Sequence, residues 1–245
     1  MNRAARRMSQ SGVYHILFRG VNQQNIFEEK ADYKKLKEAI AKVKEEMDFV
    51  IYAYCFMSNH VHMVLKEKEV GDISVIMKRI LTKYARWYNI KYGRSGALIA
   101  NRYKSIPVEV DEYFIPLIRY VHQNPIRAGI VENLEEYSNS SYIEYTGDEE
   151  ITDTSFLFAM MEQDRFVEYH KEINGDKFVV SDSTKKSDEE VLMYLKKAYK
   201  IENPKSIAKM SKIERNEILA ELKKNFPVRQ LQRLTGVSRG VITRA

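Results

Sequence analysis

The sequence predicts an α+β protein. Segments rich in β-branched and aromatic residues alternate with segments of helical period in the order β-α-β-β-α-β. Only a Met-Ser-Asn turn separates the two middle strand segments, which predicts an antiparallel hairpin. The composition, 44% hydrophobic and 11% aromatic, is typical of a globular chain. Together these features predict a ferredoxin-like split βαβ antiparallel sheet with its helices on one face.

Composition and spacing place the individual elements. Residues with high β-propensity predict four strands, over 13–19, 49–56, 60–66 and 105–110. Apolar residues that recur every three to four positions predict two helices, the first of them over 28–47. The second helix is expected to begin at Asp72, a residue type that favours helix starts, and to end before Gly93.

A third helix is predicted over 111–124, and Pro125 should end it because a residue before proline avoids the helical conformation. Tyr120 and Asn124 are four residues apart and therefore share one face, at the edge of the apolar stripe. A tyrosine there is most often a core-boundary residue, and an asparagine before proline is most often a helix stop. Pro116 lies past the first turn and predicts a kink or a later start.

Two histidines, His60 and His62, stand one residue apart in the third predicted strand. Side chains alternate along a strand, so both imidazoles point to one face while Val61 and Met63 point to the other. Imidazoles held side by side on a rigid strand supply half of a metal site. The alternative is a pair of half-buried histidines with ordinary hydrogen bonds, and the motif alone does not decide between the two.

Three parts are expected along the chain: a first domain over 1–147, a helical connector and linker over 148–186, and a helical region over 187–245. Residues 228–244 have the order helix, glycine turn, serine cap, helix, which is typical of a helix-turn-helix. Arg239, Thr243 and Arg244 on its second helix would then face the major groove or phosphates of DNA. An ordinary helical hairpin is the alternative.

The charge balance narrows the classes of partner. The 245 residues carry a net charge of +6 with a pI near 9.1, which suits a polyanionic partner. A single cysteine, Cys55, excludes an internal disulfide and favours a reducing, cytoplasmic location. No stretch approaches 18 consecutive apolar residues, so neither secretion nor membrane spanning is expected.

Five motifs in order along the chain carry a family resemblance: YHI at 14–16, RGVN at 19–22, NHVH at 59–62, NRYKS at 101–105 and RYVHQNPIRAGIV at 119–131. With these motifs the sequence closely resembles the IS200-like (Y1) transposases of the HUH superfamily, and most of all the REP-associated tyrosine transposases. The resemblance covers roughly residues 10–145. There are two departures: Ser58 stands where proline is common, and Pro116 interrupts the tyrosine helix.

The resemblance implies a site and a reaction. His60 and His62 would bind a divalent metal, Mg²⁺ or Mn²⁺, Asn124 would complete its ligand set, and Tyr120 would be the nucleophile. The implied enzyme is a transposase that cleaves and rejoins single-stranded DNA through a covalent 5′-phosphotyrosine. Hairpin-associated repeats are the implied targets. Homodimer and monomer both stay open, because related enzymes include dimers that exchange the tyrosine helix.

Basic residues near these motifs are the predicted DNA contacts: Arg102, Lys104, Arg119 and Arg127. A tyrosine phenol ordinarily titrates near 10, so Tyr120 needs help from the metal, from Arg119 or Arg127, or from the DNA. A solvated surface face is the alternative reading of these cations.

Two other functions compete with this one. The first is a non-catalytic DNA-binding or repressor protein derived from such a transposase, although a binder would need none of the implied site residues. The second is a two-histidine phosphoesterase. That mechanism usually needs a second histidine motif, which His15, His122 and His170 do not form in the sequence.

Overall fold

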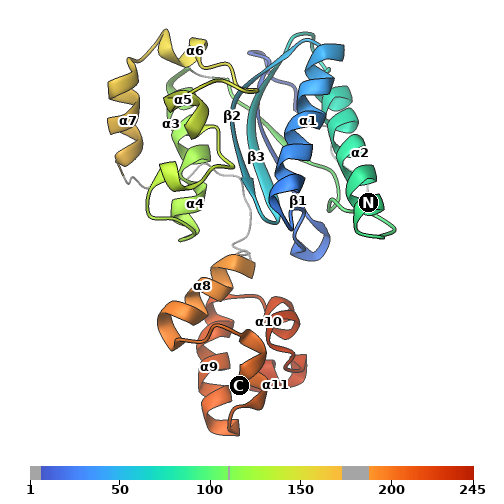
Figure 1. The fold of residues 1–245 in the computed structure, drawn as a ribbon, viewed down its shortest axis with the longest axis vertical. Coiled ribbons are helices and arrows are strands. Elements are labelled where there is room, and N and C mark those ends of the chain that lie inside the picture. Colours follow the sequence, from blue (N-terminus) through green and yellow to red (C-terminus); the bar gives the residue numbers. More distant parts are fainter. Residues whose placement is uncertain (1–6, 110, 173–187) are drawn as a thin grey trace. The chain divides into compact units, whose positions relative to one another are not determined.

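The computed structural model describes residues 7–109, 111–172 and 188–245 (Figure 1). They divide into two compact units: the first contains residues 7–127 and 131–172, and the second contains residues 188–245 together with 128–130. Most of the predicted linker, 173–186, lies outside the described residues. The remainder of the predicted connector, 148–172, belongs to the first unit, where Ile151 and Phe166 are buried.

The first unit is built on a four-stranded sheet. Its strands are β1 (Val13–Arg19), β2 (Phe49–Met57), β3 (His60–Glu67) and β4 (Lys104–Pro107). They lie in the order β2-β3-β1-β4 with every neighbouring pair antiparallel. Met57 pairs with His60 across the two-residue Ser58–Asn59 turn, so the predicted hairpin is confirmed. This is the strand order of a split βαβ sheet.

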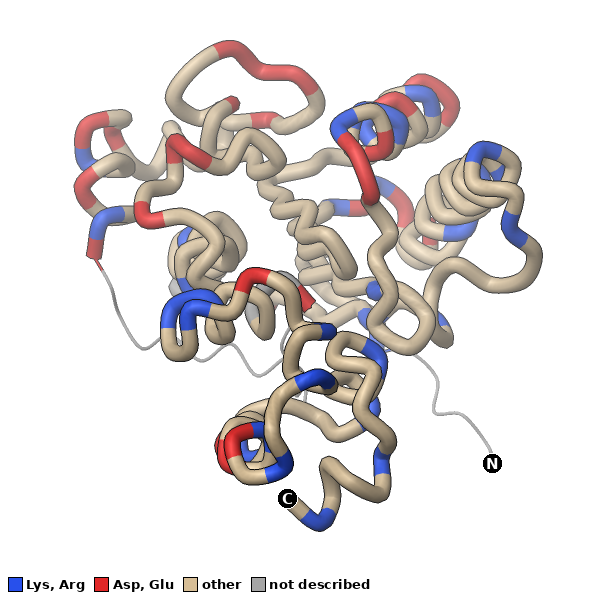
Figure 2. The backbone as a smooth tube through the Cα atoms, turned by 60° about the horizontal axis from the view of Figure 1, so that its bottom comes forward, with Lys and Arg blue, Asp and Glu red and all other residues tan. Residues whose placement is uncertain are grey.

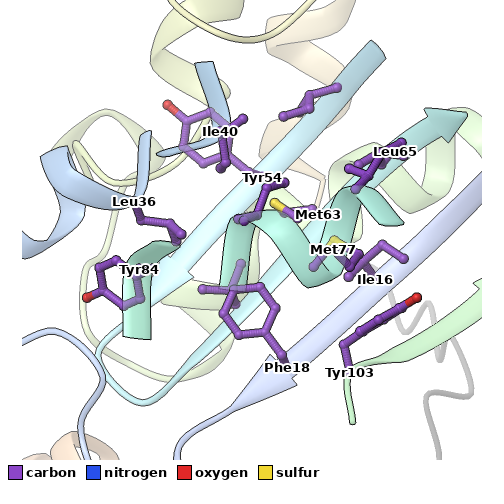
Figure 3. Close-up of a cluster of buried hydrophobic side chains, with 14 of the residues drawn as sticks. Ile16, Phe18, Leu36, Ile40, Tyr54, Met63, Leu65, Met77, Tyr84 and Tyr103 are labelled. Atoms are coloured by element: carbon purple, nitrogen blue, oxygen red, sulfur yellow. The ribbon is translucent and has the colours of Figure 1, made fainter. Parts of the chain in front are cut away.

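Two long helices, α1 (Lys30–Glu46) and α2 (Ile73–Lys91), cover one face of the sheet. Alternate strand residues point into the layer between sheet and helices, where they meet the apolar stripes of α1 and α2 (Figure 3). The labelled members of this core are Ile16, Phe18, Leu36, Ile40, Tyr54, Met63, Leu65, Met77, Tyr84 and Tyr103. The core therefore uses Met63 and Leu65 of β3 but not His60 or His62.

The start of α2 is stabilised differently from the prediction. Asp72 occupies the position before the helix, but its side chain makes no capping hydrogen bond. The buried carboxylate of Glu67 instead accepts from the Ile73 amide at 2.7 Å and from the Tyr14 hydroxyl at 2.9 Å. A residue at the end of β3 thus caps the next helix and ties it to β1.

The third helix, α3 (Asp111–His122), lies on the opposite face of the sheet from α1 and α2 (Figure 1). The prediction that the helices of the split βαβ unit share one face is confirmed for α1 and α2, and α3, which follows β4, covers the other face. Its Phe114 ring packs edge-on against Tyr52 of β2, with centroids 5.0 Å apart. The helix continues through Pro116. α3 ends at His122, two residues before the predicted end, and Pro125 lies in the first turn of the short helix that follows, where a missing amide hydrogen is tolerated.

Short elements complete the first unit around α3. They are η1 (Val21–Gln23), α4 (Asn124–Arg127), η2 (Leu134–Glu136), α5 (Tyr142–Thr146), α6 (Ser155–Phe158) and α7 (Gln163–Lys171). A buried polar chain joins α7 to α3: His122 Nδ1 lies 3.0 Å from His170 Nε2, and His122 Nε2 lies 2.8 Å from the Ser141 hydroxyl. His170 Nδ1 donates to the Phe166 carbonyl at 2.9 Å.

The second unit is helical. It contains α8 (Asp188–Tyr199), η3 (Pro204–Lys209), α9 (Lys212–Asn225), α10 (Val228–Thr235) and α11 (Arg239–Arg244). Leu195, Leu219, Leu231 and Ile242 are among the residues of its separate core. Gly236 ends α10 with a left-handed φ of 73°, the conformation that glycine adopts without strain. None of the helices in the described ranges is long and apolar enough to cross a bilayer.

Candidate active site

The two histidines of β3 point away from the α1–α2 core, toward the face covered by α3. Val61 and Met63 lie in the core, as strand alternation predicts. His62 is 4% exposed and His60 is half-buried. The His60 Nδ1 donates to Oδ1 of Asn59 at 2.6 Å, which fixes the orientation of that ring. The two ring centroids are 5.2 Å apart.

A third histidine, His15 of β1, lies beside them. Its Nε2 is 3.0 Å from Nδ1 of His62, and the two rings stack with centroids 5.2 Å apart. Burial lowers the pKa of His15 to about 4. Burial, followed by the nearby His60, His15 and Arg19, lowers the pKa of His62 well below its usual value. Both rings are therefore neutral at pH 7, the form of histidine that binds metals.

Tyr120 reaches the same place from α3. Its ring lies edge-on to both buried histidines, with centroids 5.8 Å from His62 and 5.9 Å from His15. The ring is only partly buried, so one edge stays accessible. The guanidinium of Arg127, at the end of α4, lies 4.8 Å from the Tyr120 centroid. A single chain therefore brings a tyrosine, three histidines and a cation together.

Asn124 begins α4, one turn after Tyr120. Its amide nitrogen donates to the carbonyls of Tyr120, at 2.8 Å, and Val121, at 3.2 Å. The amide oxygen is thereby the atom of this side chain left to act as a ligand. Across the described ranges, no three His, Cys, Asp or Glu side chains form a cluster that could hold a metal ion. A metal site at His60 and His62 thus depends on an amide oxygen such as that of Asn124.

The predicted DNA-contacting cations fall into two groups. Arg102, Lys104 and Arg127 are exposed, the first two at the start of β4 and the third at the end of α4. Arg119 is 3% exposed, and its guanidinium stacks on Tyr169 at 3.7 Å and pairs with Glu172 at 3.1 Å. The charge of Arg119 is thus engaged by Glu172 at the end of α7, and its predicted contact with DNA or with Tyr120 stays a prediction.

In the second unit, Arg239, Thr243 and Arg244 are all exposed on α11. The Thr243 hydroxyl donates to the Arg239 carbonyl one turn earlier, at 2.9 Å, and Lys223 of α9 donates to the Thr243 carbonyl at 3.3 Å. The helix, glycine turn and helix expected from the sequence are present as α10, Gly236 and α11. Their role in DNA binding stays a prediction.

Sequence reasoning missed His15. Its contact with His62 depends on β1 pairing with β3, which aligns Leu17 with His62 and His15 with Val64. Two features of the sequence could have indicated it. His15 lies in the YHI motif at 14–16, and alternation along the strand places it on the face opposite Ile16. The pair formed by His122 and His170 was missed for the same reason, because it joins two helices distant in sequence.

The sequence and the fold resemble those of known proteins. Residues 9–124 match the family described as "Transposase IS200 like". Among solved structures, the chain is similar to a REP-associated tyrosine transposase bound to a REP hairpin, with 18% sequence identity and a TM-score of 0.51. That match covers 62% of this chain and 94% of the other, and at this identity it shows the fold.

A second solved structure, described as a transposase from Deinococcus radiodurans R1, matches at 15% identity over 56% of this chain and 96% of that chain. Its TM-score of 0.35 is too low to support a conclusion about this chain. No curated protein matches the chain. The match over 9–124 includes the sheet, the three histidines and Tyr120. Residues 9–124, just under half of the chain, therefore resemble the IS200-like transposases.

Proposed function

We propose that this protein is a tyrosine transposase that cleaves single-stranded DNA and rejoins it through a covalent 5′-phosphotyrosine. The observation that carries the proposal is the position of Tyr120, with its ring within 6 Å of both His15 and His62. A tyrosine that only packed at the boundary of the core would not require two neutral histidines beside its ring. Beside a metal site, it is placed to act as a nucleophile.

His60, His62 and Asn124 would hold a divalent metal ion, Mg²⁺ or Mn²⁺. The donor chemistry fits: Nδ1 of each histidine bonds to Asn59 or His15, so Nε2 would be the ligand atom of both rings. Two imidazoles and an amide oxygen suit Mn²⁺ better than Mg²⁺. When bound, such an ion withdraws charge from a phosphate oxygen and makes the phosphorus a better electrophile.

The reaction we propose conserves atoms and protons. The Tyr120 oxygen forms a bond to the phosphorus, and the bond between phosphorus and the 3′ oxygen breaks. The phenol loses a proton and the departing 3′ oxygen gains one. The cation of Arg127 lies over the Tyr120 ring, 4.8 Å from its centroid, and would attract the negatively charged phosphate. Rejoining is the reverse attack by a 3′-hydroxyl, so no external energy source is needed.

All of these groups come from one chain. The distances between Tyr120 and the histidines support use of the tyrosine in cis, without exchange of α3 between subunits. We propose that a monomer is competent for cleavage. A homodimer would then serve synapsis of two DNA ends rather than assembly of the site.

The two units divide the work of DNA binding. Residues 188–245 contain thirteen Lys and Arg against seven Asp and Glu, whereas residues 1–187 contain 27 of each, so the whole net charge of +6 lies in the second unit. We propose that α10 and α11 bind DNA electrostatically, through Arg239, Thr243 and Arg244. The solved relative described as bound to a REP hairpin supports a hairpin substrate, and we propose that an unpaired flank adjoins it. Arg102, Lys104 and Arg127 would contact that flank.

The same charge distribution favours a second candidate, a DNA-binding repressor without catalysis. Such a protein would bind DNA through the second unit alone and would not need the Tyr120 hydroxyl. The decisive experiment compares wild-type protein with Tyr120→Phe on end-labelled single-stranded DNA containing hairpins, with Mn²⁺ or Mg²⁺. Products are separated under denaturing conditions to detect label, from the 3′ side of the cut, that is covalently attached to protein.

We expect an adduct with wild-type protein that disappears in Tyr120→Phe and with a chelator. The matched control is Tyr113→Phe, an exposed tyrosine on the same helix, which should keep the adduct. Cleavage that persists in Tyr120→Phe without an adduct would refute the nucleophile and favour a hydrolase. Binding of hairpin DNA without cleavage by wild-type protein would favour the repressor.

A further inference from the structure

A groove runs along the outer side of α2 in the first unit. Its second wall is the segment 97–103, which leads into β4, and its volume is about 570 Å³. Lining residues from Ser74 to Asn89 recur at helical spacing, so the groove follows α2 for roughly 20 Å at 1.5 Å per residue. We call it the α2 groove.

The α2 groove has an uncompensated positive charge. Lys78, Arg86 and Arg102 line it, and no Asp or Glu does. All three are exposed, and none forms an ion pair with another residue in the described ranges. Residues 1–187 carry equal numbers of acids and bases, yet these three charges have no acidic partner among the residues that the structure describes.

The other cations of α2 show the contrast. The helix has five Lys and Arg and no acid, whereas α1 beside it carries both signs (Figure 2). Arg79 and Lys83 both pair with Glu46 of α1, at 2.9 and 2.7 Å. Lys91 pairs with Glu29 and Asp32. One side of α2 is thus neutralised by α1, and the side that faces the groove is not.

The walls of the groove between these cations are apolar. Leu81, Ala85 and Ile99 are among the side chains that form them, and all three are partly exposed. Cations beside an apolar surface match a single nucleic-acid strand, whose phosphates meet the cations while its bases cover apolar atoms. A duplex keeps its bases stacked inside and could not cover that surface.

The α2 groove is connected to the candidate active site through backbone pairing. Ile99 forms a bridge with Gly20, and the Ala100 amide donates to the Arg19 carbonyl at 2.8 Å. Arg19 is in turn the partner of His60 in the β1–β3 ladder. The wall of the groove is therefore two strand spacings from His60, about 10 Å at 4.8 Å per spacing. Because α2 and the His60 imidazole lie on opposite faces of the sheet, a strand that reaches both would pass around the edge of the sheet.

We propose that the α2 groove binds the unpaired DNA segment that adjoins the cleaved phosphate. The inference rests on the proposed function for the identity of the substrate. The groove itself recognises a single strand through Lys78, Arg86 and Arg102, whether or not cleavage follows. Duplex DNA and hairpin stems are bound elsewhere.

The test uses the full chain carrying Tyr120→Phe, in EDTA, so that binding is measured without cleavage. The groove variant adds Lys78→Gln and Arg86→Gln. The matched control adds Arg79→Gln and Lys83→Gln, two charges removed from the same helix on the side facing α1. Affinity for an unstructured oligonucleotide is measured by fluorescence anisotropy from 50 to 200 mM salt. An iodouracil-containing oligonucleotide is then crosslinked and the attachment site mapped by mass spectrometry.

We expect the groove variant to bind roughly tenfold more weakly at 0.15 M salt, with a salt slope smaller by about 1.4, from 0.7 for each lost phosphate contact. The control should keep the parental affinity and slope. Crosslinks should map to α2 or to residues 97–103, and Arg102→Gln alone should weaken binding about fourfold. Equal affinities of the groove and control variants, or crosslinks confined to 188–245, would overturn the proposal.

Failure of the proposed function gives a different result. If wild-type protein makes no covalent adduct but the groove variant still loses affinity for single strands, the groove stands and catalysis is refuted. If the adduct forms but the groove variant binds single strands as tightly as its parent, catalysis stands and the groove proposal is refuted. Adduct formation in the wild-type background is therefore measured alongside every binding curve.

Discussion

Acidification should weaken the attachment of α7 through the buried pair His122 and His170. Both rings are neutral in the folded protein, because burial lowers the pKa of His170 to about 4 and that of His122 well below its usual value. His170 Nδ1 donates to Phe166, so its Nε2 accepts from Nδ1 of His122. A proton added to His170 would break that hydrogen bond and place a charge where it has no solvent.

The magnitude follows from the difference between folded and unfolded pKa values. The unfolded histidine titrates near 6.5 and the folded His170 near 4, so the unfolded chain takes up the proton first as pH falls. The contribution of neutral His170 to the stability of the folded protein is fully present above pH 6.5 and is lost as the pH falls from 6.5 to 4. At pH 5 the loss from His170 alone is about 2 kcal/mol, from 1.5 pH units at 1.36 kcal/mol each. His122 changes stability in the same direction.

The assay is urea unfolding at pH 7.5 and pH 5, for wild-type protein and for His170→Phe, which keeps an aromatic ring of similar size. The drop in unfolding free energy between the two pH values should be about 2 kcal/mol smaller in the variant. Histidine NMR titration of wild-type protein gives an independent check that needs no variant. A His170 resonance that titrates near pH 6.5 in the folded protein would refute the argument.

Two further predictions concern the site and its support. His15→Phe keeps a ring at this position but removes the hydrogen-bond partner of His62 Nδ1. The affinity for Mn²⁺, measured by electron paramagnetic resonance, should fall about 10- to 100-fold while the fold is retained. Unchanged Mn²⁺ affinity would mean that His15 only fills space. Gly20→Ala should cost about 1–3 kcal/mol in urea unfolding, because a Cβ there would lie 2.1 Å from the Gln24 carbonyl. A neutral effect of Gly20→Ala would show that the 20–24 loop can shift away from β3.

Local pattern was enough to predict the sheet and half of the site. Alternation in β3 correctly put His60 and His62 on the face opposite Val61 and Met63. The short turn before His60 correctly predicted the hairpin. These features depend on neighbours in sequence, where strand and helix periods decide which way a side chain points.

Features that depend on distant neighbours could not be predicted in the same way. Asp72 has the right position and chemistry for a cap, yet Glu67 makes the bond because β3 ends beside the start of α2. Arg119 precedes Tyr120 in the sequence, but adjacent helical residues point about 100° apart and Arg119 meets α7. His15 needed the strand order, which periodicity does not contain.

The two faces of the sheet have a consequence for how this protein can evolve. In β1, residues 14, 16 and 18 belong to the core, while His15 faces the site; in β3, residues 61, 63 and 65 belong to the core, while His60 and His62 face the site. Alternate positions of each strand thus serve different ends, one set packing the core and the other facing the candidate site. Substitution of the site-facing histidines would remove the proposed reaction without touching the core, so a protein that only binds DNA is a few substitutions away.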